Sequence, residues 1–383
     1  MRSSGHLIKR RTFLGAAATL TLPGLNGMLP TGNKPRRSRK PTHQSFGLRD
    51  IPRAGIARNA AESFTLVGLT WAGDKTGTDR PQFLVRTRTE RGWTEWFELH
   101  DDDHSPDPAT NEDRHSRRGT QLRLVRPSDA VQVRLKPGHA DRPDDLHVHL
   151  VNSGEPSQEI TSDALHTPAE ESTRSPSQPR IYTRAEWDAD ESIRGEPEYG
   201  DVRGMFVHHT AGTNDYSAAD VPGIIRGIYE FHVFGRLWRD IGYNFLVDKY
   251  GRLWEGRHGG ITKAVIGAHT QGYNSHSFGA AILGDYTTKA PERAARIAYR
   301  DLIVWKFALH GVTPGASVAY PDQLTLPAIS GHRDAGATEC PGQLLYSELP
   351  SIRSAALAAF HAPRYRPRNV FDADDYPRPI PMQ

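Results

Sequence analysis

The sequence predicts a mixed α/β domain, in which a β-sheet is flanked by helices, preceded by a smaller all-β, sandwich-like domain. Three observations predict this fold. Apolar and polar residues alternate with a period of two through the first part of the chain, strands mix with amphipathic helices after residue 179, and a stretch rich in Ser, Glu, Pro and Thr separates the two. With 383 residues, the chain is long enough for two domains.

The β-rich domain is predicted over residues 46–151, where turn-rich stretches separate short alternating segments. These segments lie at 64–71, 82–89, 121–125, 130–135 and 146–151, and Trp93 and Trp96 flank a further strand or sheet edge. The pattern is typical of a small antiparallel β-sandwich. The acidic loop from Asp101 to His104 resembles a metal loop, but it lacks the glycine and the spaced ligands of a calcium-binding hand. We therefore predict a solvated loop there and assign it no ligand.

The second domain is predicted over residues 179–360, after a linker at 152–178 that implies few contacts between the domains. Strands are expected at 205–209 and 278–283, a hairpin at 243–247 against 253–255, and helices at about 218–234 and 291–310. The later helix ends before Gly311 and places these residues on one face: Ala295, Ala298, Leu302, Trp305 and Leu309. Residues 361–383, rich in Pro, Arg and Asp, are expected to form a loose tail.

The basic charge of the chain is concentrated at its N-terminus. Residues 1–45 contain nine Lys and Arg and no acidic residue, which leaves 39 Lys and Arg against 45 Asp and Glu, a formal net charge of −6, in the remainder. This balance excludes a nucleic-acid-binding surface there, and no apolar run approaches the roughly 18 residues of a membrane span.

The first 45 residues read as an export signal followed by a basic linker. Lys9-Arg10-Arg11 precede a short apolar segment, Ala16 to Leu22, in a pattern that resembles a bacterial twin-arginine signal. A basic amphipathic helix is the alternative. We predict an exported protein, extracellular or associated with the cell wall, with no membrane span beyond the signal and with residues 34–44 unstructured.

Three candidate metal ligands stand out after residue 179. His208 ends an apolar strand, and His332 and Cys340 lie eight residues apart across a loop. Two imidazoles and a thiolate suit tetrahedral zinc, and three protein ligands leave a fourth position for water, which is the catalytic form of a zinc site. Metal binding also explains the only cysteine of the chain, which has no partner for a disulfide. For each residue alone, the alternative is a buried core histidine or a buried thiol.

Several motifs carry a resemblance to a known family: VHHTAG at 207–212, DIGYNFLVD at 240–248, LWEGR at 253–257, GAHTQGYNSHSFG at 267–279, GHRD at 331–334 and TECPG at 338–342. In order and approximate spacing, they resemble the peptidoglycan recognition protein and phage-lysozyme type of N-acetylmuramoyl-L-alanine amidase, over about residues 179–357. The resemblance implies a central mixed sheet packed by about three helices. It also implies a Zn²⁺ ion held by His208, His332 and Cys340, and hydrolysis of the amide bond between N-acetylmuramic acid and L-alanine in peptidoglycan.

The resemblance further implies roles for individual residues. Tyr243 matches the catalytic tyrosine, whose hydroxyl can reach the zinc water or the developing oxyanion; the alternative is a strand tyrosine with an ordinary hydrogen bond. Thr338, also a catalytic candidate, stands where some phage members carry a lysine, so we expect a hydrogen bond from it at most. The candidate substrate-binding residues, at positions the family uses around the stem peptide or the sugar, are His209, His232, Arg236, Arg257, His269 and Asn274.

A non-catalytic peptidoglycan-binding module is the alternative function, because many family members bind the wall without cutting it. Those members typically lack the cysteine, so Cys340, together with both histidines and Tyr243, favours hydrolysis. A zinc carboxypeptidase or endopeptidase acting on the wall peptide would need different surrounding motifs. The expected partners are peptidoglycan and its muropeptides, and we expect a monomer.

Overall fold

The computed structural model describes residues 42–48, 55–72, 81–108, 110–137, 143–152, 154, 177–321 and 323–362. The predicted export signal, most of the predicted linker and the tail beyond residue 362 lie outside the described residues. No helix in the described part of the chain is long and apolar enough to cross a membrane.

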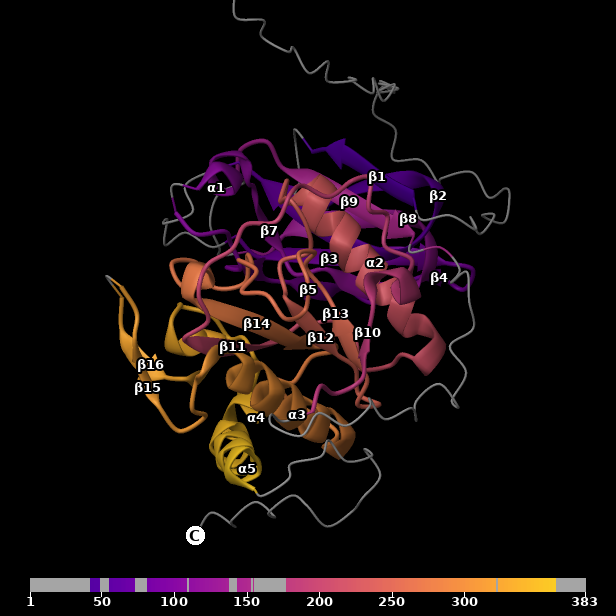
Figure 1. Cartoon of the computed structure of the whole chain (residues 1–383). Helices are drawn as coiled ribbons and strands as arrows, with labels where there is room; N and C mark the ends of the chain where they lie inside the picture. The colour runs from indigo at the N-terminus through magenta and orange to yellow at the C-terminus, as the bar shows by residue number, and fades with distance from the viewer. Residues whose placement is uncertain are drawn as a thin grey trace, which may run out of the picture. The chain divides into compact units, whose positions relative to one another are not determined.

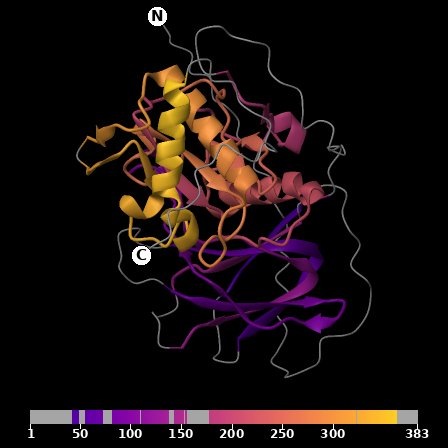
Figure 2. The ribbon, with the colours of Figure 1, turned by 90° about the horizontal axis from the view of Figure 1, so that it is seen from below.

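The β-rich region is one hydrogen-bonded network of nine strands within the described residues, and every pair in it is antiparallel (Figures 1 and 2). Its elements are β1 (Thr42–Gly47), β2 (Ile56–Trp71), β3 (Phe83–Thr89), β4 (Gly92–Trp93), β5 (Phe97–Leu99), β6 (Asp101–Asp102), α1 (Asn111–His115), β7 (Arg118–Thr120), β8 (Arg123–Leu135) and β9 (His147–Asn152). Alternate residues of β3 are buried, as a period of two requires. They join a core that includes Phe64, Val133 and Leu150.

Two details of this region differ from the sequence prediction. Residues 123–125 and 130–135, expected in two separate strands, belong to a single strand, β8. Residues 42–44 were expected to be unstructured, but they begin β1, because their backbone pairs with the edge of β9 from Thr42 opposite Asn152. Backbone pairing at a sheet edge requires no apolar pattern, so periodicity does not predict it.

The second region is built on a six-stranded sheet with the order β10-β13-β12-β14-β11-β17, in which only β12 and β13 are antiparallel. Its elements are β10 (Ile181–Tyr182), β11 (Gly204–His209), α2 (Val221–Glu230), β12 (Phe245–Val247), β13 (Leu253–Glu255), β14 (Ser277–Ile282), α3 (Arg293–His310), β15 (Ser317–Ala319), β16 (Thr325–Pro327), β17 (Ile329–Gly331), α4 (Gln343–Ser347) and α5 (Leu349–His361). A π-helical turn, Phe231–Gly235, continues α2.

The helices cover both faces of this sheet. α3 and α5 share a core with Phe245, Val247 and Ile282, whereas α2 packs with Leu246 and Ala281, which alternate to the other face. The predicted mixed α/β class is therefore confirmed. The buried face predicted for α3 is wrong at one residue. Leu309 is 44% exposed, because Phe307 is the last buried apolar residue of this helix.

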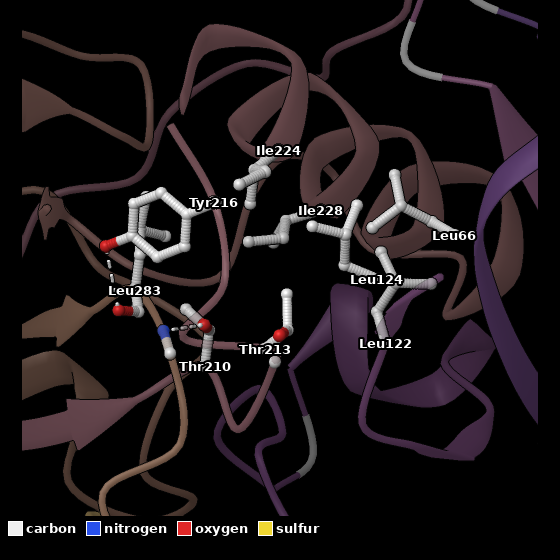
Figure 3. A pocket seen from close by; sticks show the side chains of 11 residues that line it. Leu66, Leu122, Leu124, Thr210, Thr213, Tyr216, Ile224, Ile228 and Leu283 are labelled. Carbon is white, nitrogen blue, oxygen red and sulfur yellow. Dashed lines mark hydrogen bonds between the residues drawn. The ribbon is translucent and has the colours of Figure 1, made fainter. Parts of the chain in front are cut away.

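The two regions share a hydrophobic core, so the expectation of few contacts between them is wrong. All ten residues of α2 are buried, and its outer side packs against Leu66, Leu122 and Val151 of the β-rich region. Figure 3 shows the small pocket at this junction, with Leu66, Leu122 and Leu124 facing Ile224 and Ile228 of α2. The described residues accordingly fall within one compact unit, residues 35–383. The sheet covers only one side of α2, and the β-rich region covers the side that carries Ile224 and Ile228.

Candidate metal centre

The sheet register brings the two predicted histidine ligands together. β11 and β17 are adjacent parallel strands, and Val207 pairs with Gly331, so the next residues, His208 and His332, leave the same edge of the sheet side by side. Their ring centroids are 4.8 Å apart. The carboxyl ends of parallel strands are where α/β folds build their sites, because side chains from several strands converge there.

Cys340 completes the predicted set of three. Its Sγ lies 3.5 Å from Nδ1 of His208, and both side chains are fully buried. Burial lowers the pKa of His208, which keeps the imidazole neutral and able to ligate. Burial raises the pKa of the Cys340 thiol well above its ordinary value, so a thiolate at this place requires a cation beside it.

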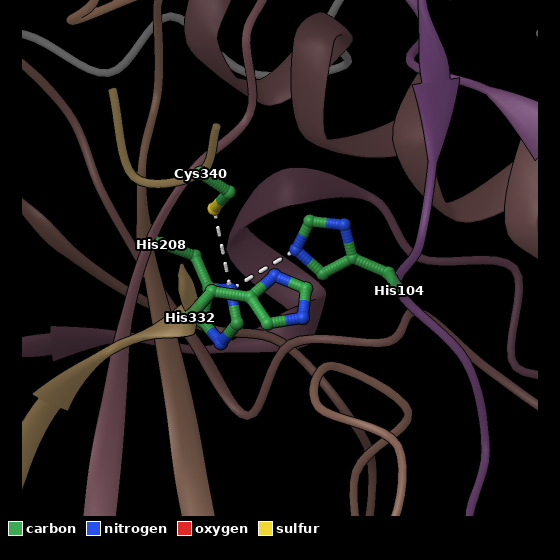
Figure 4. Close-up of side chains that lie close together, drawn as sticks. All are labelled: His104, His208, His332 and Cys340. Carbon is green, nitrogen blue, oxygen red and sulfur yellow. Dashed lines mark hydrogen bonds between the residues drawn. The ribbon is translucent and has the colours of Figure 1, made fainter. Parts of the chain in front are cut away.

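A fourth donor, His104, comes from the β-rich region. Its Nε2 lies 3.0 Å from Nδ1 of His208, and its ring lies 4.6 Å from that of His332 (Figure 4). One ligand atom from each of His104, His208, His332 and Cys340 lies within 4.8 Å of all the others, so the four could hold one metal ion.

The solvated loop predicted at 101–104 is therefore wrong. His104 is 2% exposed, and Asp102, which contacts its Nδ1, is also buried. Burial alone would raise the pKa of Asp102, but His104 and Arg236 beside it hold that pKa below its ordinary value. The Asp-x-His spacing is the sign of this site in the sequence, but the absence of a calcium-binding pattern favoured a solvated loop.

His269 stands behind the metal centre and not in an open groove. Its Nδ1 lies 3.2 Å from Nε2 of His208, the nitrogen that faces away from the other donors, and 3.1 Å from the hydroxyl of Thr270. Gly279 makes room for the ring, because a Cβ there would lie 2.3 Å from Cγ of His269. This is the place of a residue that orients a metal ligand, so its position does not support the predicted substrate contact.

Tyr243 lies beside the cluster. Its ring centroid is 5.7 Å from that of His208 and 5.2 Å from that of His104. Burial raises its pKa well above the ordinary value, so the hydroxyl keeps its proton. Thr338 accepts a hydrogen bond from the backbone N–H of Cys340 through its Oγ1, at 3.1 Å, which gives it a role in positioning the cysteine loop.

His232 and His209 are both buried, and each accepts a hydrogen bond from a backbone N–H. Nδ1 of His232 accepts a hydrogen bond from the backbone of Gly242, and its ring lies 4.5 Å from that of Trp238. His209 follows His208 on the strand and so faces the other side of the sheet, where its Nδ1 accepts a hydrogen bond from the backbone of Tyr286. Trp238 and Trp254 are both buried.

The other three substrate-binding candidates are held by the acidic segment, defined here as residues 101–108 and 110–115 of the β-rich region. Arg236 donates to Asp102 at 3.0 Å, and Arg257 donates to both carboxylate oxygens of Glu112, at 2.8 and 3.0 Å. The side-chain amide of Asn274 donates to Asp107 at 2.8 Å. Glu112 keeps a pKa below its ordinary value, because the Arg257 guanidinium outweighs the opposing effect of burial.

Comparisons with known proteins match the two regions separately. The family model described as N-acetylmuramoyl-L-alanine amidase matches residues 198–343, and the one described as Rv3811 N-terminal galactose-binding domain-like matches residues 30–176. The chain is 34% identical to peptidoglycan-recognition protein LB of Drosophila melanogaster, over 45% of this chain and 68% of that protein. It is 36% identical to the N-acetylmuramoyl-L-alanine amidase of Mus musculus, but it spans only 30% of the length of that relative. The solved structure of wild-type Drosophila PGRP-LB matches 45% of this chain and 93% of its own, with 30% identity and a TM-score of 0.38.

Proposed function

We propose, from the premise that this chain belongs to the family of peptidoglycan recognition proteins and N-acetylmuramoyl-L-alanine amidases, that it is a zinc-dependent amidase. Its reaction is hydrolysis of the amide bond between N-acetylmuramic acid and L-alanine in bacterial peptidoglycan. The observation that carries the proposal is the convergence of His208, His332 and Cys340 at one edge of the sheet. Export to the cell wall remains a prediction, since residues 1–41 lie outside the described part of the chain.

The donor set fits zinc. Imidazole nitrogen and thiolate sulfur are the usual protein ligands of Zn²⁺, and ligands at about 2.0–2.3 Å from a tetrahedral ion lie roughly 3.3–3.8 Å apart. The separations of 3.0 Å between His104 and His208 and 3.5 Å between Cys340 and His208 are close to that range. A bound zinc ion supplies a Lewis acid that polarises the scissile carbonyl and activates water.

Tyr243 is the proposed catalytic side chain of the protein. Its protonated hydroxyl can donate a hydrogen bond to the oxygen of the scissile carbonyl as negative charge develops there. Burial strengthens such a bond, because water does not compete for the donor. His269 and Thr338 act through the ligands: His269 orients His208, and Thr338 fixes the backbone at Cys340.

Recognition without hydrolysis is the second candidate function, and His104 is the observation that favours it. Four protein ligands are the closed, structural form of a zinc site, whereas hydrolysis needs three and an open position. The two candidates therefore differ in whether His104 can leave the centre.

The products of digestion separate the two functions. Purified sacculi are digested with the zinc-loaded wild-type chain and with His104→Ala, and the soluble products are identified by mass spectrometry. An amidase releases intact stem peptides that begin with L-alanine and carry no muramic acid. Cys340→Ala in each background is the matched control, with metal content measured in parallel. If neither the wild type nor His104→Ala releases such peptides with zinc bound, recognition without hydrolysis is the function.

A further inference from the structure

The acidic segment lies beside the metal centre and occupies the space between Arg236, Arg257 and Asn274, which is the groove of the candidate site. Asp102 and Glu112 hold the guanidinium groups of Arg236 and Arg257, and all four side chains are buried. Arg236 also donates to the backbone carbonyls of Arg117 and His104, at 2.9 and 2.6 Å. Two of the basic groups beside the candidate site thus have carboxylate partners from the other region of the chain.

Asp107 is bound more extensively still. Its Oδ1 accepts hydrogen bonds from the backbone N–H groups of Gly272 and Asn274 and from the side-chain amide of Asn274, at 2.8, 3.0 and 2.8 Å. Its Oδ2 accepts from the backbone N–H and the hydroxyl of Ser275, at 2.9 and 2.6 Å. A carboxylate that accepts five hydrogen bonds is held as a bound anionic ligand would be.

The segment is held in its conformation by the β-rich region. β6, at its start, pairs with β7, with Asp102 opposite Gly119. Gly119 makes room for Arg236, because a Cβ there would lie 2.9 Å from its Cδ. At the other end, Thr110 caps α1 by accepting the N–H of Asp113 at 3.1 Å. The segment therefore enters the groove in a defined conformation and not as a loose loop.

We propose that the acidic segment is a built-in occupant of the active-site groove, which keeps the enzyme latent, with His104 as a displaceable fourth ligand of the metal. The inference rests on the proposed amidase function and extends it. With the segment in place, the metal has four protein ligands and the groove is filled. Withdrawal of the segment leaves His208, His332 and Cys340 as the three ligands of a catalytic site and frees Arg236, Arg257 and Asn274.

Removing two carboxylates tests whether the segment occupies the groove as a unit. In Asp102→Asn/Glu112→Gln, the closed arrangement retains two buried guanidinium groups without their carboxylates, and these regain full solvation only when the segment leaves. Asp129→Asn is the matched control, because Asp129 pairs with Arg88 within the β-rich region, at 2.7 Å. His104→Ala removes the fourth ligand without creating a buried charge, so it remains informative if the double variant does not fold.

The first readout is the absorption spectrum of the full-length protein loaded with Co²⁺ in place of zinc, which reports the coordination geometry of the ion and changes when a ligand is exchanged. We expect His104→Ala and Asp102→Asn/Glu112→Gln to share one spectrum, and the wild type and Asp129→Asn to share another. The same spectrum from a change at the ligand and from a change at the carboxylates would show that His104 leaves the metal when the carboxylate contacts are lost. A His104→Ala spectrum identical to that of the wild type would overturn the proposal.

The second readout is binding of a soluble disaccharide-tetrapeptide muropeptide to the zinc-free proteins, measured by calorimetry so that no turnover occurs. Because the apparent affinity falls with the fraction of molecules that are open, the double variant should bind at least about ten-fold more tightly than the wild type and Asp129→Asn. Equal affinity in all forms would overturn latency. Release of stem peptides is measured separately. Altered spectra and tighter binding without any release would support occupation of the groove by the acidic segment and contradict the amidase function.

Discussion

The two regions of the chain contribute to one site, yet only one of them carries recognisable motifs. The sheet region supplies His208, His332 and Cys340 from short segments whose residue types indicate their chemistry. The β-rich region supplies His104 and three carboxylates from a segment whose composition indicates only a solvated loop. A catalytic motif identifies a site, but it does not show what else the chain places in that site.

The contrast is sharpest for the buried charges. Within the described residues, Arg236 and Arg257 are almost fully buried, and their carboxylate partners, Asp102 and Glu112, lie more than a hundred positions earlier in the chain. A buried arginine needs a partner, and within the sheet region the guanidinium of Arg257 donates to backbone carbonyls, whereas that of Arg236 lies over the ring of Trp238. Buried guanidinium groups whose paired carboxylates come from a distant part of the chain are therefore a sign that another segment covers them.

The largest expected effect is the loss of zinc and activity on removal of Cys340, compared with removal of His104 from the same centre. Cys340→Ala should lose stoichiometric zinc and reduce hydrolysis to background, because the thiolate is the strongest donor of the set. His104→Ala should keep one zinc per chain, since three ligands suffice for a catalytic site. Metal analysis after dialysis, together with stem-peptide release, measures both. If the two variants lose zinc equally, the distinction between permanent and displaceable ligands fails.

Tyr243→Phe gives the next largest effect. Phenylalanine keeps the ring beside His208 and removes only the hydroxyl, so kcat should fall by about 10²- to 10³-fold while zinc content and KM change little. If Tyr243 is merely a packed tyrosine, kcat stays near normal. Steady-state kinetics in the His104→Ala background measures kcat in a protein that lacks the fourth ligand. A Tyr243→Phe variant that retains more than about half of kcat would show that Tyr243 has no catalytic role.

Sequence and structure agree where local pattern determines the outcome. The strand of residues 204–209, the strand of residues 277–282 and the helix of residues 293–310 follow from periodicity and from the glycine after His310, whose φ of 68° suits a helix end. The side-by-side arrangement of His208 and His332 follows from strand register, which periodicity does not specify. The contact of His104 with this pair depends on how two regions pack, and no local pattern encodes that.

The substrate-binding candidates show the same limit. The motifs placed His269 near the site, and it lies there, but behind His208, because the space above Gly279 accepts its ring. The resemblance made His209 a substrate-binding candidate, but alternation along the strand directs it to the face opposite His208. A residue next to a ligand in sequence is the one least able to share its site on a strand.

His269→Ala should have a smaller effect than Tyr243→Phe and a different signature. Loss of the group that orients His208 should weaken zinc binding by about 10- to 100-fold, without changing the number of ions bound at saturation. Competition with a chelator of known affinity measures the change. At saturating zinc, kcat should recover most of its wild-type value, whereas a residue that contacts substrate would remain impaired however much zinc is added.

The smallest expected effect tests the packing between the regions. Gly227 lies within α2, and a Cβ there would lie 2.1 Å from Cδ1 of Leu66 on β2. Alanine is the better helix former by about 1 kcal/mol, so Gly227→Ala stabilises the protein if the regions are not packed together. If they are, the clash should outweigh this gain and destabilise the protein by about 1–2 kcal/mol.

A double-mutant cycle distinguishes this clash from a local defect in the helix. Leu66→Ala removes the atoms that the new methyl group meets, so in that background Gly227→Ala should become neutral or stabilising, with a coupling free energy of about 1–2 kcal/mol. Urea unfolding of the four proteins measures the cycle, provided that the m-value stays constant. Additive effects would mean that α2 and β2 do not touch at this point, and the route by which the acidic segment reaches the metal centre would then lose its support.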